Sequence, residues 1–546
     1  MKIIVVIPAR GGSKGIPRKN IRLMKGLPLI SYVIKTALES SFNPDVNVST
    51  DSEEIADVAI KFGAKVLMRD SALAGDMVTL DPVIYDALVK AEKENRCTYD
   101  LIITMQPTSP LTSVNTLDKA IKEFISKKYN TLISVVNKPH LNWAEKDNKI
   151  VPAYEKRLNR QQLPKNYLET GAFVITDRDS ISSSTRIGKK IGVFEVPEKE
   201  AVDIDSEIDW IIAEAQLKKK RILFRADGYV KLGMGHIYNC ITLAYALIGH
   251  DILFVTREDC DLGLKKIKES LFPYKTIKTD KDLLSIVSEY KPDIFVNDCL
   301  NTESEYIQKL KELVPRVITI EDLGSGAYAA DAVINALYDS PENETSRFYS
   351  GYKYVCLRDE FLLAQPKDFS EKVKNIVILF GGTDPSNLNE KTYKAVLGLH
   401  EKYPDITFNF ITGIGYEADR YGVVSNPEKN IFVYPNVPAV TKYTGQADMA
   451  ITSQGRTIYE LAVLGIPSIV ISQNQRETLH RFASMKQGFL NLGLGDTVDS
   501  SSIANTISWL VDTPNIRKNM HNLMLRYDLK SGLSRCKKII LGEYDA

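Results

Sequence analysis

The feature that most constrains the fold of this chain is its start, where an apolar run leads directly into a basic, glycine-rich loop. Residues 3–7 read Ile-Ile-Val-Val-Ile and are followed by Pro8. Such a run, bounded by proline and glycine, is typical of a strand buried on both faces in a parallel sheet. The loop contributes three glycines, a serine and four cations: Gly11, Gly12, Gly15, Ser13, Arg10, Lys14, Arg18 and Lys19.

Exposed backbone N–H groups and fixed cations are what a polyphosphate requires, so this loop is a candidate phosphate-binding site. A run of cations can also be no more than a solvated surface. We favour the phosphate-binding interpretation because a buried strand and glycines precede the cations. The spacing matches neither the Walker P-loop nor the Rossmann dinucleotide fingerprint.

Predicted strands and helices alternate after this loop. We expect strands at 46–51, 64–67 and 101–106, and helices at 29–40, 53–62 and 80–95. This alternation predicts a parallel α/β sheet, in which ligands bind at the carboxyl ends of the strands. Arg10, Asp51 and Gln106 each come at or just after the end of a predicted strand, so this fold would bring them together.

A second chemical signal comes from two carboxylates near residue 204. Asp203 and Asp205 lie two residues apart in an extended segment, so their side chains point the same way and can hold a hard cation. The alternative is a simple helix start, because Ser206 and Asp209 form a capping-box pattern for a helix through Gln216. Both interpretations can hold at once.

These motifs resemble those of the CMP-sialic acid synthetases (acylneuraminate cytidylyltransferases). The first loop reads Pro-Ala-Arg-Gly-Gly-Ser-Lys-Gly-Ile-Pro-Arg-Lys-Asn from residue 8, and the similarity extends over residues 1–218. Further matching segments follow in the family's order at 49–52, 69–76, 106–111, 160–164, 171–173 and 203–205. One position departs from the pattern, since Thr112 stands where the family usually has arginine.

The resemblance implies a nucleotidyltransferase domain that transfers CMP from CTP to a nine-carbon 2-keto (sialic-like, nonulosonic) sugar acid and releases pyrophosphate. It implies Mg²⁺ on Asp203 and Asp205, and a homodimer through this domain. Charge neutralisation at the phosphates assigns catalytic roles to Arg10, Lys14, Lys19 and Asp205. Nucleotide contacts are expected from Gly11, Gly12, Ser13, Asn20, Arg69 and Asp76. Sugar contacts are expected from Gln106, Arg160, Gly171 and Phe173. We identify no general base.

A charged segment, Lys218 to Arg221, separates this domain from a second α/β half. Strands are expected near 222–226, 252–256, 293–297 and 316–320, and again near 375–380, 406–412, 447–452 and 467–472. Two similar α/β lobes predict a GT-B-like module of two Rossmann-like domains, with lobes at 222–365 and 372–546. The whole chain is thus predicted as α/β, with a Rossmann-like nucleotidyltransferase sheet at 1–218 followed by this module.

The second half carries its own candidate site. His236 follows a glycine at a predicted helix start, where we expect a lowered pKa and a neutral imidazole that acts as a base; the alternative is a capping or packing histidine. Gly381 and Gly382 form a turn suited to a diphosphate. Glu460 and Asn474 are expected at the nucleoside, with Glu460 accepting from ribose hydroxyls.

This half resembles the hydrolases of pseudaminic acid synthesis that release UDP from UDP-2,4-diacetamido-trideoxy sugars. The matching segments are Arg225 to Ala244, Leu357 to Phe361, Gly381 to Asn387, Gly455 to Pro467, and Asn474-Gln475. The sequence departs from that family at Asn239, where the family has arginine, and at Asp298-Cys299-Leu300, where an aromatic residue is missing.

Bulk properties narrow the possible functions. The 546 residues carry a net charge of +1, which argues against a nucleic-acid partner. We expect no signal peptide, because the first residues are strand-like, and no apolar run approaches the ~20 residues needed to cross a membrane. Six scattered cysteines favour reduced thiols in the cytoplasm. We therefore expect a bifunctional enzyme of nonulosonic acid activation; the alternatives for the second half are a glycosyltransferase or a non-catalytic nucleotide-sugar-binding regulator.

Overall fold

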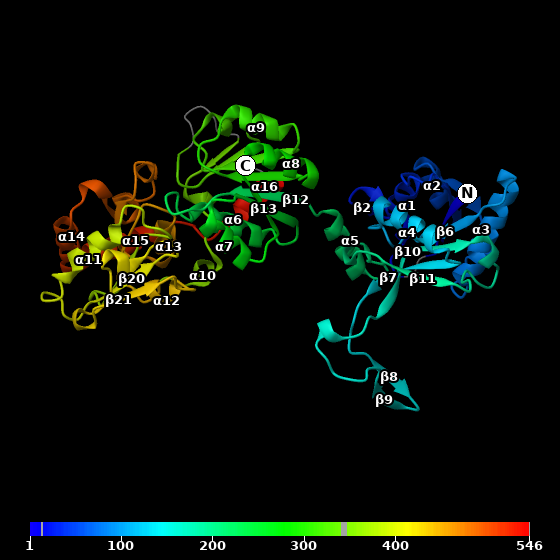
Figure 1. Ribbon diagram of the computed structural model, residues 1–546, viewed down its shortest axis with the longest axis horizontal. Coiled ribbons are helices and arrows are strands. Elements are labelled where there is room, and N and C mark those ends of the chain that lie inside the picture. The colour runs from blue at the N-terminus through cyan, green and yellow to red at the C-terminus, as the bar shows by residue number, and fades with distance from the viewer. Residues whose placement is uncertain (13–14, 340–346, 545–546) are drawn as a thin grey trace. The chain divides into compact units, whose positions relative to one another are not determined.

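The computed structural model describes residues 1–12, 15–339 and 347–544 and divides into two compact units (Figure 1). The first unit is Met1–Lys219 and the second is Lys220–Ala546. Within the described residues, no helix combines the length and apolar character that a membrane crossing needs.

The first unit is built on a seven-stranded mixed sheet with β1 near its middle. The strand order is β11-β7-β10-β6-β1-β4-β5, and β1 pairs in parallel with both β4 and β6. Only β10 runs antiparallel to its two neighbours. The strands are β1 (Ile3–Pro8), β4 (Asp45–Thr50), β5 (Lys65–Met68), β6 (Leu101–Thr104), β7 (Thr131–Asn137), β10 (Tyr167–Asp177) and β11 (Ile191–Glu195).

Helices cover both faces of this sheet, as the apolar run of β1 predicted. Val5 and Ile7 lie in a core cluster with Val33 of α1, whereas Ile4 and Val6 lie in another. Because successive residues of a strand point to opposite faces, a strand covered on both sides must be apolar throughout. The helices are α1 (Leu29–Leu38), α2 (Glu53–Lys61), α3 (Leu80–Asn95), α4 (Val114–Lys127) and α5 (Glu207–Leu217).

Helix α5 begins with the predicted capping box. The Ser206 side chain accepts from the Asp209 backbone N–H, and the Asp209 side chain accepts from the Ser206 backbone N–H. These two bonds fix the point where the extended segment carrying Asp203 and Asp205 turns into the helix.

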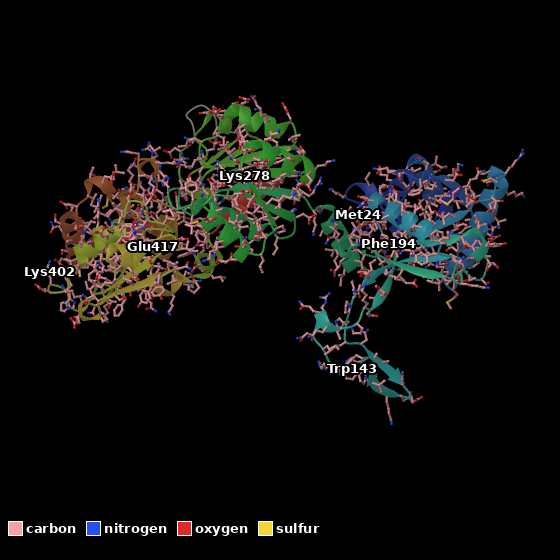
Figure 2. All side chains as sticks on the ribbon, viewed as in Figure 1. Met24, Trp143, Phe194, Lys278, Lys402 and Glu417 are labelled. Carbon is pink, nitrogen blue, oxygen red and sulfur yellow. The ribbon has the colours of Figure 1, made fainter. Side chains whose placement is uncertain are left out.

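A small hairpin stands away from the body of the first unit (Figure 1). It consists of β8 (Trp143–Lys146) and β9 (Lys149–Pro152), which pair antiparallel. Figure 2 shows Trp143 on this hairpin, whereas Phe194 lies within the sheet region. Trp143 and Ile150 are mostly exposed. A second short hairpin, β2 (Leu23–Met24) with β3 (Leu27–Pro28), precedes α1.

The second unit contains two sheets, and among its described residues all strand pairings within them are parallel. The first has the order β14-β13-β12-β15-β16-β17-β18. Its strands are β12 (Arg221–Ala226), β13 (Asp251–Arg257), β14 (Tyr274–Ile277), β15 (Ile294–Asp298), β16 (Arg316–Ile320), β17 (Ala332–Asn335) and β18 (Phe348–Ser350). Its helices are α6 (Gly235–Ala246), α7 (Asp261–Glu269), α8 (Asp280–Tyr290) and α9 (Ser304–Lys311).

The second sheet repeats this topology with the order β21-β20-β19-β22-β23-β24. Its strands are β19 (Asn375–Leu379), β20 (Thr407–Thr412), β21 (Ile431–Pro435), β22 (Met449–Thr452), β23 (Ser468–Ser472) and β24 (Phe489–Leu494). The helices of this part are α10 (Asp359–Leu363), α11 (Leu388–Leu397), α12 (Thr441–Thr444), α13 (Thr457–Leu464), α14 (Ser500–Asp512) and α15 (Pro514–Met524).

In both sheets the chain order reverses beside the first strand, which is the switch point where doubly wound sheets bind ligands. The second unit is therefore a two-lobed, GT-B-like module, as predicted. The last helix, α16 (Gly532–Leu541), belongs by sequence to the second lobe, which was expected at 372–546, but it packs against the first lobe. Cys536 and Ile539 of α16 share a core cluster with Ile222 of β12.

Candidate functional sites

In the first unit, the ends of β1, β4 and β5 meet at one edge of the sheet. The Gly11 backbone N–H donates to Asp51 Oδ1 at 3.1 Å, and Arg69 Nη2 lies 3.4 Å from the same oxygen. Arg10 Nη1 lies 2.9 Å from Asp76 Oδ1. Gly11 and Arg69, both expected at the nucleotide, thus contact Asp51, and the catalytic candidate Arg10 contacts Asp76.

The loop is tied to the segment that carries the two carboxylates. Lys19 Nζ donates to the Ile204 carbonyl at 2.7 Å and lies 3.4 Å from Asp205 Oδ1. A Cβ on Gly15 would come within 2.6 Å of the Asp205 carbonyl oxygen, so the loop approaches this segment as closely as only glycine permits. Asn20 is buried, and its Nδ2 donates to the Arg10 carbonyl at 3.0 Å, which fastens the loop from within.

Asp203 and Asp205 differ in their surroundings in a way that suits a cation. Asp203 Oδ1 is buried and has no hydrogen-bond partner among the described residues. Burial raises the pKa of the Asp203 carboxyl. The Asp205 side chain is 81% exposed. A buried carboxylate oxygen without a donor, next to an accessible carboxylate, fits Mg²⁺, which typically takes one or two carboxylates and leaves its other positions to phosphate and water.

Gly171, which was expected to contact the sugar, lies beside the carboxylate of Asp203. A Cβ there would come within 2.7 Å of Ser109 Oγ, 3.1 Å of Asp203 Oδ1 and 3.3 Å of Gln106 Cβ. The Gln106 backbone N–H donates to the Gly171 carbonyl at 3.1 Å. Gln106, Gly171 and Asp203 therefore adjoin one another.

Other expected residues lie elsewhere. Phe173 is 1% exposed and belongs to the sheet core, where its ring centroid is 5.8 Å from that of Phe194. Its large apolar ring is stabilised by burial, so it is not available to a sugar at the surface. Arg160 is exposed on the segment that returns from the β8–β9 hairpin. Gly12 is exposed in the loop. Ser13 and Lys14 lie outside the described residues.

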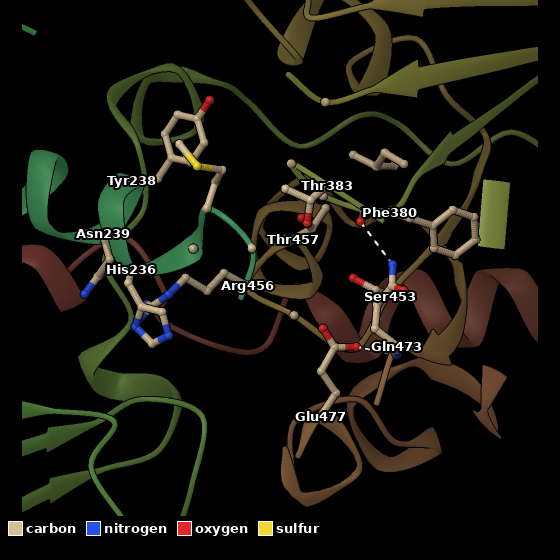
Figure 3. A pocket seen from close by; sticks show the side chains of 18 of the residues that line it. His236, Tyr238, Asn239, Phe380, Thr383, Ser453, Arg456, Thr457, Gln473 and Glu477 are labelled. Atoms are coloured by element: carbon tan, nitrogen blue, oxygen red, sulfur yellow. Dashed lines mark hydrogen bonds between the residues drawn. The ribbon is translucent and has the colours of Figure 1, made fainter. Parts of the chain in front are cut away.

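In the second unit, a cavity of about 510 Å³ is lined by residues of both lobes (Figure 3). His236 lies in the first turn of α6, and its Nδ1 is 2.6 Å from Asp298 Oδ1. Asp298 ends β15 and is fully buried. Asn239, one turn along α6, donates from Nδ2 to Asp298 Oδ2 at 2.9 Å.

The prediction of a lowered pKa for His236 is wrong. Burial lowers the pKa of His236, but the nearby Asp298 carboxylate raises it by more. The pKa of His236 therefore lies above its ordinary value. Burial likewise opposes the charge on Asp298, yet His236 and Arg456 hold the pKa of Asp298 below its ordinary value. The Asp298 contact occupies Nδ1 and leaves Nε2 to take a proton.

An ion pair that sequence reasoning missed crosses the cleft. Glu321 follows β16, and its Oε1 lies 2.8 Å from Arg456 Nη2 of the other lobe. Arg476 Nη2 donates to the Glu321 carbonyl at 2.7 Å. Glu321 has a φ of 53°, a left-handed conformation that is uncommon without glycine and concentrates at functional sites. The sequence does carry one signal that could have identified Glu321: it is a charged residue directly after the strand predicted near 316–320.

The glycine turn after β19 is less open to a diphosphate than expected. Gly381 has a φ of 80°, and a Cβ on Gly382 would come within 2.9 Å of Met234 Cβ in the other lobe. Asp384 already accepts from the Leu388 and Asn389 backbone N–H groups at 2.9 and 2.8 Å. The N-terminus of α11 is therefore capped by this chain's own carboxylate.

The two residues expected at the nucleoside line the same cavity. Glu460 Oε1 accepts from Arg358 Nε at 2.8 Å, and Asn474 Oδ1 accepts from the Glu477 backbone N–H at 3.1 Å. Glu477 also lines the cavity and was not predicted. Glu477 Oε2 accepts from the Gln473 backbone N–H at 2.7 Å, and burial raises the pKa of Glu477 to about 7.

Comparison with known proteins identifies the family to which the first unit belongs. Residues 4–232 match the cytidylyltransferase family. The CMP-N,N'-diacetyllegionaminic acid synthase of Campylobacter jejuni is 36% identical over 228 residues, which cover 40% of this chain and 97% of that protein. An uncharacterized protein of Methanocaldococcus jannaschii is 33% identical over 276 residues, 47% of this chain; the chain spans only 56% of its length.

The crystal structure of Acinetobacter baumannii MurG covers 59% of this chain and 99% of its own, with 14% identity and a TM-score of 0.44. Our assignment of the fold of the second unit depends on its strand order and not on this likeness.

Proposed function

Because this chain belongs to the cytidylyltransferase family, we propose that its first unit transfers CMP from CTP to a nine-carbon 2-keto sugar acid of the sialic, legionaminic or pseudaminic type. Pyrophosphate is the second product. The observation that carries the proposal is the meeting of the glycine-rich loop with the carboxylate segment, through Lys19, Gly15 and Asp205.

In this reaction a sugar hydroxyl attacks the α-phosphorus of CTP, and negative charge develops on phosphate oxygens. Lys19 and Arg10 are held beside the loop N–H groups, where they neutralise that charge without covalent chemistry. Asp203 and Asp205 would hold Mg²⁺, which when bound supplies further charge neutralisation and lowers the pKa of the attacking hydroxyl. Gln106, beside Gly171 and Asp203, is placed to orient the sugar acid.

The direct test is a panel of nonulosonic acids offered with CTP to the purified full chain, with and without EDTA. We expect a CMP-sugar and pyrophosphate from at least one such acid, and loss of both with EDTA. Absence of product with every acid, in protein that still binds CTP, would remove this function.

We propose that this unit forms a homodimer through its hairpin. The support is the exposed apolar surface on and beside β8–β9, where Trp143 is 57% and Ile150 is 67% exposed. Trp143 and Ile150 lie on paired strands of one projecting hairpin, and apolar side chains that gather in an exposed patch mark protein–protein interaction sites. Analytical ultracentrifugation should show a dimer that Trp143→Ser together with Ile150→Ser converts to a monomer.

For the second unit we propose hydrolysis of a UDP-diacetamido sugar, supported by the His236–Asp298 pair in the 510 Å³ cavity. Release of UDP without any acceptor tests it. UDP release only with an added sugar acceptor would indicate a glycosyltransferase instead, and binding without turnover a regulatory module.

We also propose that the protein is located in the cytoplasm. The proposed substrates are nucleotides, and all six cysteines are free thiols, which is typical of a reducing compartment.

A further inference from the structure

The chain crosses between the two lobes of the second unit twice, and the two crossings touch. The first crossing is the connecting segment, residues 351–358, which leads from β18 to α10. The second brings the chain back from α15 to α16, which packs against the first lobe. Arg535 Nη1 of α16 donates to the Lys353 carbonyl at 3.1 Å, and a Cβ on Gly532 would collide with the Val355 carbonyl oxygen. Helix α16 therefore lies directly against the backbone of the connecting segment.

Side chains of the connecting segment point alternately into the cores of the two lobes. Val355 and Leu357 are each 1% exposed and belong to a core cluster with Val377 of β19. Cys356, between them, packs instead against the cluster that contains Ile222 of β12. This alternation is that of extended backbone, in which successive side chains point to opposite sides. A covalent bond at Cys356 would therefore restrain the backbone that joins the lobes.

Cys356 and Cys536 bring two thiols together at this contact. Cys536 lies one turn after Gly532 on α16, on the same face of the helix. The thiols of Cys536 and Cys356 donate to one carbonyl oxygen, that of Tyr354, at 3.1 and 4.0 Å. The two cysteine side chains also interact with each other. Cys536 is 0% exposed, whereas Cys356 is partly exposed and lines the cavity between the lobes. An oxidant in solution can thus reach Cys356 but not Cys536.

The guanidinium of Arg456, which lines the same cavity, lies close enough to act on both thiols. The contact with Cys356 and burial raise the pKa of the Cys536 thiol, and Arg456 opposes that rise. A nearby cation stabilises a thiolate, the form of cysteine that reacts with peroxides and disulfides. Cys356 combines this cation with access from the cavity, so it is the sulfur that reacts first with an oxidant.

We propose that Cys356 and Cys536 form a thiol modification site: a peroxide oxidises the pair to a disulfide, and a low-molecular-weight thiol reduces it again. The disulfide ties α16 to the connecting segment and so fixes one crossing between the lobes to the other. Reversible closure is consistent with a reducing compartment, where the cysteines are free thiols until a peroxide is present. The inference does not depend on which reaction the second unit catalyses.

The modification takes two steps. The Cys356 sulfur first forms a bond to one oxygen of hydrogen peroxide, the O–O bond breaks, and the hydroxide that leaves takes the thiol proton and becomes water. The Cys536 sulfur then attacks the Cys356 sulfur of the resulting sulfenic acid. The S–O bond breaks, and the second hydroxide leaves with the Cys536 proton as water. Two thiols are thus oxidised by two electrons in total, and one peroxide is reduced to two waters.

The experiment treats the folded full chain with a small molar excess of hydrogen peroxide, blocks the remaining thiols with iodoacetamide, and identifies the peptides by mass spectrometry. We expect a peptide pair joined through Cys356 and Cys536, which dithiothreitol separates. The unfolding temperature of the second unit should rise by roughly 5 °C on oxidation and return on reduction, because a cross-link restricts the unfolded chain. Recovery of both cysteines as alkylated thiols, or of Cys356 joined to any other cysteine, would overturn the proposal.

Cys356→Ser removes the reactive sulfur at a partly exposed position, so the variant should fold and show no rise in unfolding temperature with peroxide. Cys299→Ser is the matched control, because Cys299 is also a partly exposed cysteine of the second unit. It should keep both the joined peptides and the full temperature rise. An equal rise in Cys356→Ser and wild type would show that the stabilisation does not come from this pair.

Cys536→Ala separates the two steps. Without the second thiol, Cys356 should stop at the sulfenic acid, which dimedone labels, and wild type should show little of this label because Cys536 consumes the intermediate. Labelling of wild type and Cys536→Ala to the same extent would mean that Cys536 does not reach the Cys356 sulfur, and the proposed disulfide would be wrong.

Discussion

Lys19 and Asp205 are 186 positions apart in the chain, yet Lys19 Nζ lies 3.4 Å from Asp205 Oδ1. The lysine side chain is only 14% exposed, and its second contact is the Ile204 carbonyl. One ammonium group therefore joins the basic loop to the carboxylate segment. This brings the two motifs together in a single site.

Asp205→Asn should abolish pyrophosphate release while the protein stays folded. The change keeps the side-chain volume but removes a ligand charge, and an 81% exposed side chain contributes little to packing. Pyrophosphate release over a range of Mg²⁺ concentrations measures the effect. Glu207→Gln, an equal loss of charge at an exposed position two residues away, is the control and should behave as wild type. Near-normal turnover of Asp205→Asn would refute the metal assignment.

Lys19→Ala should reduce kcat by roughly 10²–10³-fold, the scale of losing one preorganised charge at a transition state. Steady-state kinetics with CTP and the sugar acid varied in turn is the measurement. Lys25→Ala is a matched control, since Lys25 Nζ also donates to a backbone carbonyl, that of Leu217, at 2.9 Å. A defect limited to the KM for the sugar would place Lys19 away from the phosphates.

A fragment of residues 1–219 should fold and retain cytidylyl transfer. Helix α5 completes its own core, because Ala213 and Ile204 cluster with Ile16, Met24 and Leu29. Circular dichroism and pyrophosphate release measure this. A shorter fragment, 1–200, lacks the carboxylate segment and should be inactive. An insoluble 1–219 fragment, beside an active full chain, would show that the first unit needs the second.

The central elements of the fold could be predicted from the sequence because their signals are local. The apolar run of β1 and the capping box at Ser206 depend on a few neighbouring residues. Edge strands such as β14 and β24 were missed, and they are partly exposed, which weakens their apolar pattern. The interior strands β7 and β10 were missed as well, although β7 is almost fully buried.

Long-range partners account for the errors at the sites. Asp298 is 62 positions from His236 and reverses the expected direction of its pKa shift. Such effects depend on which charge the fold brings near, and a motif does not contain that information.

Glu477→Gln should stabilise the second unit at high pH. Burial raises the pKa of Glu477 from 4.5 to about 7, so the folded state binds this proton more tightly than the unfolded state does. The resulting stabilisation is complete below pH 4.5 and is lost as the pH rises through about 7. At 1.36 kcal/mol per pKa unit, the variant should gain roughly 3 kcal/mol in free energy of unfolding at pH 8.

The measurement for Glu477→Gln is urea unfolding of the full chain at pH 5 and pH 8. The gain should be much smaller at pH 5, where the wild-type carboxyl is mostly protonated. Glu417→Gln, at a position that is 75% exposed, controls for the loss of one surface carboxylate. Equal stability of Glu477→Gln and wild type at pH 8 would contradict the raised pKa.

His236→Asn should lower UDP-sugar hydrolysis by roughly 10²–10⁴-fold, the usual contribution of a positioned base. UDP binding, measured by calorimetry, should change little, and CMP transfer by the first unit should not change, because its cations lie in the other unit. Equal hydrolysis by variant and wild type would remove His236 from the chemistry.

The pH dependence gives a sharper test of the same pair. The base form of His236 is required, and its pKa is raised, so the wild-type rate should increase with pH through an inflection above 6.5. Asp298→Asn removes the charge that raises this pKa, while burial, which lowers it, remains. The inflection should therefore move to lower pH in Asp298→Asn, with a reduced plateau because the imidazole loses its fixed orientation. An inflection that stays in place would mean that the titrating group is not His236.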